Sequence, residues 1–181
     1  MSLNIVLEKI KHNKYQIIQI VGAVLIAISP FFSWEVLEIE GAGQDTITKN
    51  SLKDLALWDS ELGTHFGWLV KGMLAIGVIL AFIHILKCFF PRVLQKFDNK
   101  AIKYVFITLV ALAVVFLLVA YNSKTIKNDV KWYAELINNY KMVYSDVKGN
   151  GGRGVGPVLC LVGILSQIPE VIKIFINVKT K

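Results

Sequence analysis

One acidic residue lies inside a long apolar run and is the first candidate for chemistry. Glu170 directly follows Pro169 within the run 155–178, and Gln167 precedes both. A charged side chain inside a membrane is costly, so such residues often mark an ion or proton path. Proline has no amide hydrogen, so Pro169 removes the helical donor of the Leu165 carbonyl. The pattern predicts a kinked polar patch formed by Gln167, Pro169 and Glu170.

Two interpretations of Glu170 remain open. In the first, the carboxylate belongs to a transport path together with Lys71, which lies near the opposite membrane face. In the second, which we favour, Glu170 pairs with Lys173 one helical turn later and reaches the headgroups. A transport path requires several polar residues on facing helices, and Gln16 and Gln19 of the first apolar run are the remaining candidates.

The other reactive residue types do not form a recognisable catalytic or metal site. The histidines His12, His65 and His84 lie far apart and lack the spacing of a zinc site. Cys88 and Cys160 are expected at opposite membrane faces, so they cannot form a disulfide with each other. Cys88 is either a palmitoylation site or, as we favour, a packing residue. We expect no metal, no cofactor and no enzymatic activity.

A glycine-rich segment matches a nucleotide-binding pattern by spacing alone. Residues 149–154 read G-N-G-G-R-G, which fits G-x-G-x-x-G. The segment does not follow a predicted strand, and an apolar run comes directly after it. We therefore expect a flexible loop at 149–154 rather than a phosphate site.

A surface rich in tryptophan and tyrosine is the second candidate site. In the polar segment 122–154, apolar and aromatic residues recur at spacings of three and four, which predicts an amphipathic helix. Its stripe must pack on the first polar segment, on lipid or on another chain. We favour packing on the first polar segment, and a partner surface is the alternative, because aromatic residues make large contacts at low entropy cost. The predicted interaction surface consists of Trp58, Trp132, Tyr133, Tyr140 and Tyr144.

Four apolar runs must position all of these residues. Each is close to the 20 residues that cross the hydrocarbon of a bilayer as a helix. The chain has 181 residues, of which 55% are hydrophobic, so we expect one membrane domain over residues 1–181. The sequence predicts an all-α membrane protein, a four-transmembrane-helix bundle with a small β-like first outer loop and an extended third helix. The predicted spans are 15–34, 66–86, 102–121 and 155–178.

The polar connections carry weaker secondary-structure signals. Residues 34–39 and 46–49 are rich in β-branched and aromatic types around a turn signal at 41–43, which predicts a β-hairpin. The helical stripe in 122–154 predicts that the third span continues beyond the membrane or bends into a second helix. Pro30 is a poor neighbour for a cleavage site, so the first run is expected to be an uncleaved span.

The basic residues indicate orientation rather than nucleic-acid binding. The net charge is +7, and the lysines and arginines gather at the ends of apolar runs, where they meet lipid headgroups. They are densest near the two termini and in the connection 87–101. We therefore expect a multi-pass protein of the cell membrane with both termini cytoplasmic, and with the loops 35–65 and 122–154 outside.

This plan resembles the claudin-like four-span membrane proteins. The resemblance rests on the topology, on Trp34 at the start of the first outer loop, and on Leu57-Trp58 before the second span. It covers most of the chain in architecture but only these positions in residues. The cysteine pair of the family's first loop is absent here, and the second loop is longer. The resemblance implies a small sheet in the first outer loop, and it does not imply paracellular sealing.

Two functions follow as hypotheses. The first is a non-enzymatic membrane protein that acts by protein–protein interaction through its outer loops, in an accessory, immunity or assembly role. Its partners would be the lipid bilayer and another membrane or envelope protein or a second copy, and no nucleic acid. The second is a subunit of a transporter or channel that uses Gln167, Pro169 and Glu170.

Overall fold

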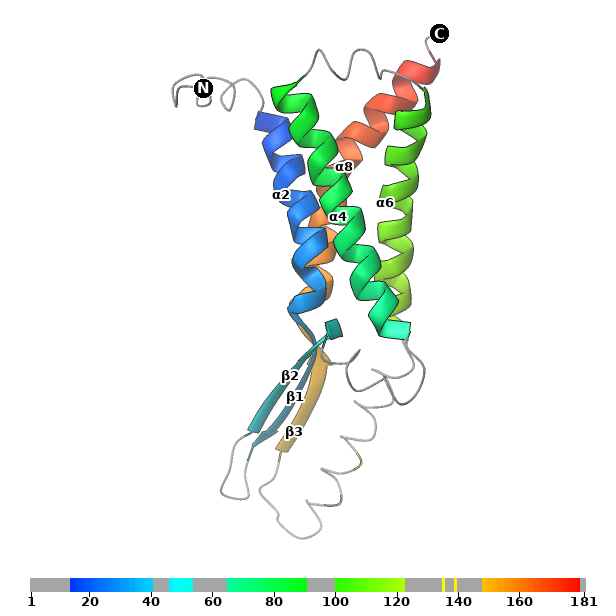
Figure 1. Ribbon diagram of the computed structural model, residues 1–181. Helices are drawn as coiled ribbons and strands as arrows, with labels where there is room; N and C mark the ends of the chain where they lie inside the picture. The colour runs from blue at the N-terminus through cyan, green and yellow to red at the C-terminus, as the bar shows by residue number, and fades with distance from the viewer. Residues whose placement is uncertain are drawn as a thin grey trace, which may run out of the picture.

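The chain forms a bundle of four long helices. The computed structural model describes residues 14–40, 46–53, 65–90, 100–122, 135, 139 and 148–179. All four helices are long and apolar enough to cross a bilayer, so the chain is a multi-pass membrane protein and the predicted bundle is confirmed. The helices are α2 (Lys14–Ile28), α4 (His65–Phe89), α6 (Lys100–Tyr121) and α8 (Gly156–Lys179) (Figure 1).

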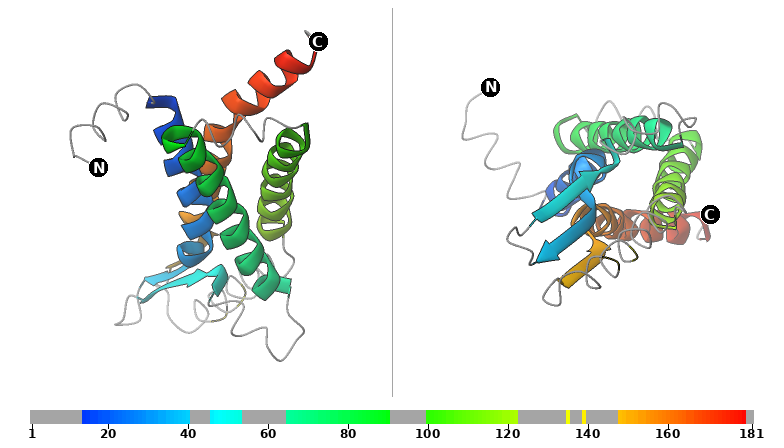
Figure 2. Two further views of the ribbon diagram at one scale, coloured as in Figure 1. Left: turned by 45° about the horizontal axis from the view of Figure 1, so that its top comes forward. Right: turned by 90° about the horizontal axis from the view of Figure 1, so that it is seen from below.

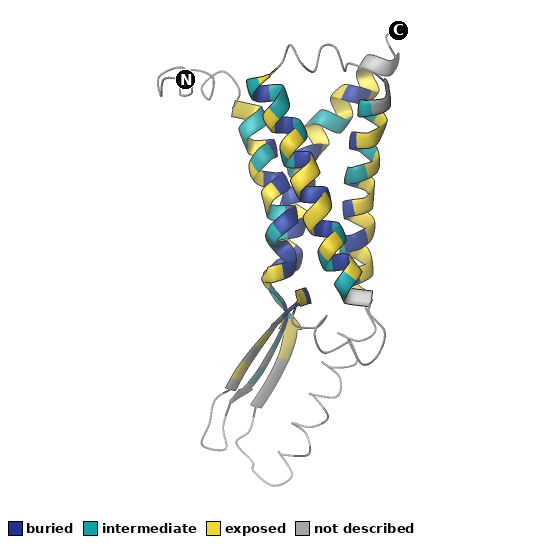
Figure 3. Cartoon of the chain, in the orientation of Figure 1, coloured by how far each residue is buried: buried dark blue, intermediate teal, exposed yellow. Residues whose placement is uncertain are grey.

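The helices surround a common core in the order α2, α4, α6 and α8, as the end-on view shows (Figure 2). The buried residues line the inward side of each helix (Figure 3), and Ile26, Met73, Phe106 and Ile164 lie among them. Large apolar side chains are exposed on the outward sides of all four helices. A surface that is apolar all round suits lipid rather than water.

The closest helix contacts involve α2, which packs extensively on both α4 and α8. A Cβ atom at Gly163 of α8 would lie 2.5 Å from the Gly22 carbonyl oxygen and 2.8 Å from Cγ1 of Ile26. Only glycine allows two backbones to approach this closely. Helix α2 begins and α8 ends at one end of the bundle, which we call the terminal end (Figure 1). The opposite end is called the sheet end.

A three-stranded antiparallel sheet extends from the sheet end (Figure 1). Its strands are β1 (Ser33–Glu40), β2 (Thr46–Ser51) and β3 (Lys148–Arg153), in the order β2-β1-β3. The predicted hairpin is confirmed by the pairing of β1 with β2. The prediction of a flexible loop at 149–154 is wrong, because β3 occupies most of this segment and pairs with β1. Ladder hydrogen bonds come from the backbone, so a glycine-rich segment can form an edge strand.

The first helix is shorter than the predicted span. Helix α2 ends at Ile28, and a single 3₁₀ turn, η1 (Ser29–Phe31), contains Pro30 before the chain enters β1. Trp34, the predicted last residue of the span, therefore lies in β1. The apolar run continues past the helix end because Trp34 is buried in the junction between helix and sheet.

The third helix, α6, ends at Tyr121, and Asn122 follows in a turn. The predicted continuation falls in 123–147, where Glu135 and Asn139 are the only described residues, and both are helical. The rest of that prediction lies outside the described residues.

Candidate functional site

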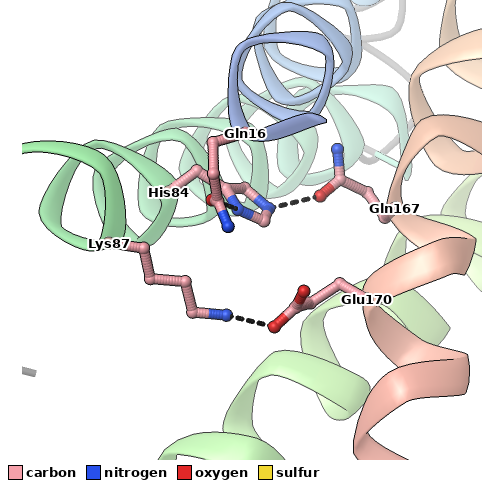
Figure 4. Close-up of polar contacts among 5 residues, drawn as sticks. All are labelled: Gln16, His84, Lys87, Gln167 and Glu170. Carbon is pink, nitrogen blue, oxygen red and sulfur yellow. Dashed lines mark hydrogen bonds and ion pairs between the residues drawn. The ribbon is translucent and has the colours of Figure 1, made fainter. Parts of the chain in front are cut away.

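Five polar side chains from three helices meet inside the bundle near the terminal end (Figure 4). We call this set the polar cluster, and its contacts join α2, α4 and α8 into one network. The cluster consists of Gln16 of α2, His84 and Lys87 of α4, and Gln167 and Glu170 of α8.

His84 is the centre of the cluster and is fully buried. Its Nε2 atom lies 2.7 Å from Oε1 of Gln167, and its Nδ1 atom lies 3.2 Å from Oε1 of Gln16. The ring packs edge-on against Phe106 of α6, with the ring centroids 5.5 Å apart. One imidazole therefore contacts residues from all three other helices of the bundle.

The Gln167 amide is held in one orientation by its other partners. Its Nε2 atom donates to the backbone oxygen of Gln19 at 2.8 Å and to Oγ of Ser166 at 2.9 Å. The Ser166 hydroxyl donates in turn to the Gly163 carbonyl at 2.7 Å. Since the nitrogen of the amide is taken up by two acceptors, the oxygen must face His84.

An ion pair forms the second contact between α4 and α8. Lys87 Nζ lies 2.6 Å from Oε1 of Glu170, and it also lies 5.2 Å from the centre of the Phe106 ring. The sequence favours Lys173 as the partner of Glu170, but the side chain bonded to the carboxylate is Lys87, and Lys173 is exposed. Glu170 pairs with Lys87 across the bundle rather than with Lys173 on its own helix, because its side chain faces α4 (Figure 4).

The structure separates the residues of the predicted intramembrane site. Gln167 and Glu170 lie in the cluster, whereas Pro169 between them is exposed on the outward side of α8. Lys71 is exposed and precedes His84 on α4 by a separation of about 20 Å along the helix axis. Lys71 therefore does not belong to the cluster. All five residues of the predicted interaction surface, Trp58, Trp132, Tyr133, Tyr140 and Tyr144, lie outside the described residues.

Sequence reasoning missed His84 and Lys87 as members of the site. A usable signal was present, because His84 and Lys87 are three residues apart, as are Gln167 and Glu170. Residues at this spacing share one helix face. Two apolar helices that each carry such a polar pair have a reason to pack with those faces together.

The sheet end is joined to the bundle through Trp34, which is fully buried. Its Nε1 atom donates to the Ser29 carbonyl at 2.8 Å, and its backbone oxygen accepts from the Gly154 amide at 3.2 Å. A Cβ atom at Gly156 would collide with the Trp34 ring and would lie 3.0 Å from the Ser29 carbonyl. The first residue of α8 is thus fitted directly against the indole.

A second link joins the sheet to α6. Nη2 of Arg153, the last residue of β3, donates to the backbone oxygen of Tyr121 at 2.7 Å. The guanidinium carbon also lies 4.8 Å from the centre of the Tyr121 ring. The last carbonyls of a helix lack intrahelical donors and carry partial negative charge, so an arginine stabilises this helix end.

Within the described ranges, no group of three or more histidine, cysteine, aspartate or glutamate residues is arranged to hold a metal. In comparisons with known proteins, no family model, no curated protein and no solved structure matches the chain.

Proposed function

We propose that the chain is a non-enzymatic membrane protein that binds another protein through its outer sheet and loops. The observation that carries this proposal is the composition of the sheet. Strands β1 and β2 come from the first polar loop and β3 comes from the second, so both loops build one platform. Trp34 and Arg153 attach that platform to α8 and α6. A platform held in a fixed position is suited to recognition.

One face of the sheet is available for contact. Directly opposed residues of an antiparallel sheet share a face, and Glu38 pairs with Ile47 while Val36 pairs with both Lys49 and Gly152. We call these five residues the open face. Its apolar member Ile47 is 61% exposed, and a Cβ atom at Gly152 would meet nothing within 4 Å. Ile47 on β2 and Gly152 on β3 flank β1 on its two sides, and together they leave room for a partner side chain on this face.

The polar cluster also favours an interaction protein over a pump or channel. Glu170 is already bonded to Lys87, and Gln167 is already bonded to His84 and to the backbone of α2. A carboxylate with a bonded lysine partner is a weak candidate for a free ion site. The architecture expected from the claudin-like resemblance, with a small sheet beside four spans, supports the same proposal. We further infer that both termini are cytoplasmic and that the sheet lies outside.

The test is site-specific photo-crosslinking in the native membrane. A photoreactive residue at Ile47 should crosslink a discrete partner or a second copy. The control position is Val158, which is equally apolar and 56% exposed but lies on α8 within the membrane. Crosslinks that are equal at both positions, or absent at Ile47, would contradict the proposal.

The proposed orientation has a separate test. A cysteine at exposed Lys49 should react with a membrane-impermeant maleimide on intact cells, whereas one at Lys96 should react only after lysis. Native Cys88 and Cys160 are buried and should give little background. The reverse pattern would place the sheet in the cytoplasm.

A second candidate function is a transporter or channel subunit that uses Gln167, Pro169 and Glu170. One observation favours it, because Oε1 of buried Gln19 has no hydrogen-bond partner among the described residues. An orphan acceptor inside a membrane is costly and suggests a passing ligand or water. In proteoliposomes, flux that disappears in Glu170→Gln would support this function. Flux no greater than that of empty liposomes would exclude it.

A further inference from the structure

Both ring nitrogens of His84 face amide oxygens, which is more than a neutral ring can satisfy. An amide oxygen only accepts hydrogen bonds, and a neutral imidazole carries one N–H. Oε1 of Gln167 lies 2.7 Å from Nε2 and Oε1 of Gln16 lies 3.2 Å from Nδ1. As arranged in Figure 4, the cluster therefore suits an imidazolium that donates from both nitrogens.

The two glutamines differ in their freedom to respond. A turned Gln167 amide would set its oxygen against the Gln19 carbonyl, which now accepts from its nitrogen at 2.8 Å. Nε2 of His84 must therefore keep its hydrogen in both charge states. Gln16 is only partly buried, and its recorded partner among the described residues is His84. Its amide can turn, so that nitrogen faces a neutral Nδ1 and oxygen faces a protonated one.

We propose that His84 is a proton-binding site and that the Gln16 amide turns when the charge of the ring changes. The imidazolium donates from Nδ1 to Oε1 of Gln16, and the neutral ring accepts at Nδ1 from the turned amide nitrogen. The proton comes from water at the terminal end. His84 lies five residues before Phe89, the last residue of α4, which corresponds to about 7 Å along the helix axis. This inference does not rest on the proposed partner binding.

The nearest charges around the ring largely cancel, so a bound proton is opposed mainly by the burial of the ring. From α4, Lys87 opposes the proton, and from α8, Glu170 favours it while Lys173 lies exposed further along. From α6 the ring faces Phe106, with Lys103 one turn earlier. From α2 it faces the uncharged Gln16, and Lys14 is exposed. The Lys87–Glu170 pair is neutral in sum, so the proton adds one net positive charge.

Proton binding would reverse the hydrogen bond between α2 and α4 but keep the direction of the one between α4 and α8. The bond from Nε2 to Gln167 persists in both states, whereas the bond from Nδ1 to Gln16 reverses its direction. The charged ring strengthens both hydrogen bonds, since bonds from ionised donors are stronger than neutral ones, but only the Gln16 amide has to turn.

The test uses nitrogen NMR of the full chain in lipid nanodiscs. The chain has three histidines, so His12→Gln with His65→Gln leaves His84 as the only labelled ring. As the pH is raised from acid, we expect conversion from a doubly protonated ring to a neutral ring that keeps hydrogen on Nε2. A neutral ring with hydrogen on Nδ1, or a ring whose charge does not change, would overturn the proposal.

Two variants of Gln16 test whether its amide responds to the charge of His84. Gln16→Met removes the acceptor and should weaken proton affinity roughly tenfold, whereas Gln16→Glu should strengthen it. The matched control is Ile18→Met, a substitution on the lipid-exposed side of α2, which should leave proton affinity unchanged. If His84 keeps its wild-type proton affinity in Gln16→Met, the Gln16 amide does not respond to the charge of the ring, and the proposal is overturned.

Discussion

The two ends of the bundle are held together by different physical means. At the sheet end, the tightest contact depends on shape, because Gly156 of α8 is fitted against the buried Trp34 ring, and the indole and guanidinium groups there donate to backbone oxygens. At the terminal end, the contacts depend on polar groups, because His84, Lys87, Gln167 and Glu170 bond across the core. A tightly packed junction is destabilised by an added atom, whereas a polar junction is destabilised when one of its partners is removed.

Each end contains one buried cysteine, which makes the comparison measurable. Cys160 lies near the sheet end of α8, and Cys88 lies near the terminal end of α4. Damage confined to one end should raise the maleimide reactivity of the cysteine at that end. Equal exposure of both cysteines would indicate that the two ends unfold together.

The largest effect is expected from Gly156→Ala. The added methyl group would collide with the Trp34 indole, and overpacking a rigid site costs about 2–3 kcal/mol. Cys160 should become reactive before Cys88 in a denaturant titration of the micellar protein. The matched control is Gly67→Ala in α4, where a Cβ atom would meet nothing within 4 Å. If both variants lose the same stability, the steric account of the junction is wrong.

The next largest effect is expected from Lys87→Met. This change leaves Glu170 without its ion partner inside the bundle and should destabilise the protein by about 2 kcal/mol. Cys88 should become the more reactive cysteine. The double variant Lys87→Met with Glu170→Met should recover most of the loss, because no unpaired charge remains. A double variant as unstable as the single one would mean that lysine packing, and not charge, holds this end.

A smaller effect is expected from Gln167→Leu. The variant removes the acceptor of His84 Nε2 and the donor to the Gln19 carbonyl, and such losses in membrane bundles cost about 1 kcal/mol. The measurement is the same denaturant titration, with the reactivity of Cys88 as the local readout. Unchanged stability and an unreactive Cys88 would show that lipid or water readily replaces these bonds.

The smallest effect is expected from Arg153→Ala, which separates β3 from the end of α6. The bond to the Tyr121 carbonyl is exposed, so its loss should cost about 0.5–1 kcal/mol. The reactivity of Cys160 should change little, because the junction at Gly156 stays intact. The control is Lys49→Ala, on the exposed face of β2. If Arg153→Ala loses as much stability as Gly156→Ala, polar contacts hold both ends of the bundle.

Local sequence signals predicted the four helices and the β1–β2 hairpin. They were least reliable where a distant segment decides the local structure. Residues 149–153 have the composition of a loop, yet they pair with β1 because that strand presents an open edge. Trp34 prolongs an apolar run by composition, yet its burial depends on Ser29 and on the start of α8.

In the polar cluster, too, the sequence identified single residues but not their partners. Glu170 was recognisable because a carboxylate is conspicuous in an apolar run, but its partner was chosen by the packing of α4 against the core. His84 alone gives no signal, since a single histidine in a span has many possible partners. Lys71 was predicted for this site because it is a lysine in an apolar run, but it is exposed and lies about 20 Å from His84 along α4.

Hydropathy and length, which act through each segment separately, determined that this chain crosses a membrane as four helices. The tertiary structure decided which polar side chains meet and that both polar loops contribute strands to one sheet. The order and rotation of the helices depend on close contacts such as that of Gly163 with Gly22. Those contacts join residues far apart in the chain, and no local pattern encodes their pairing.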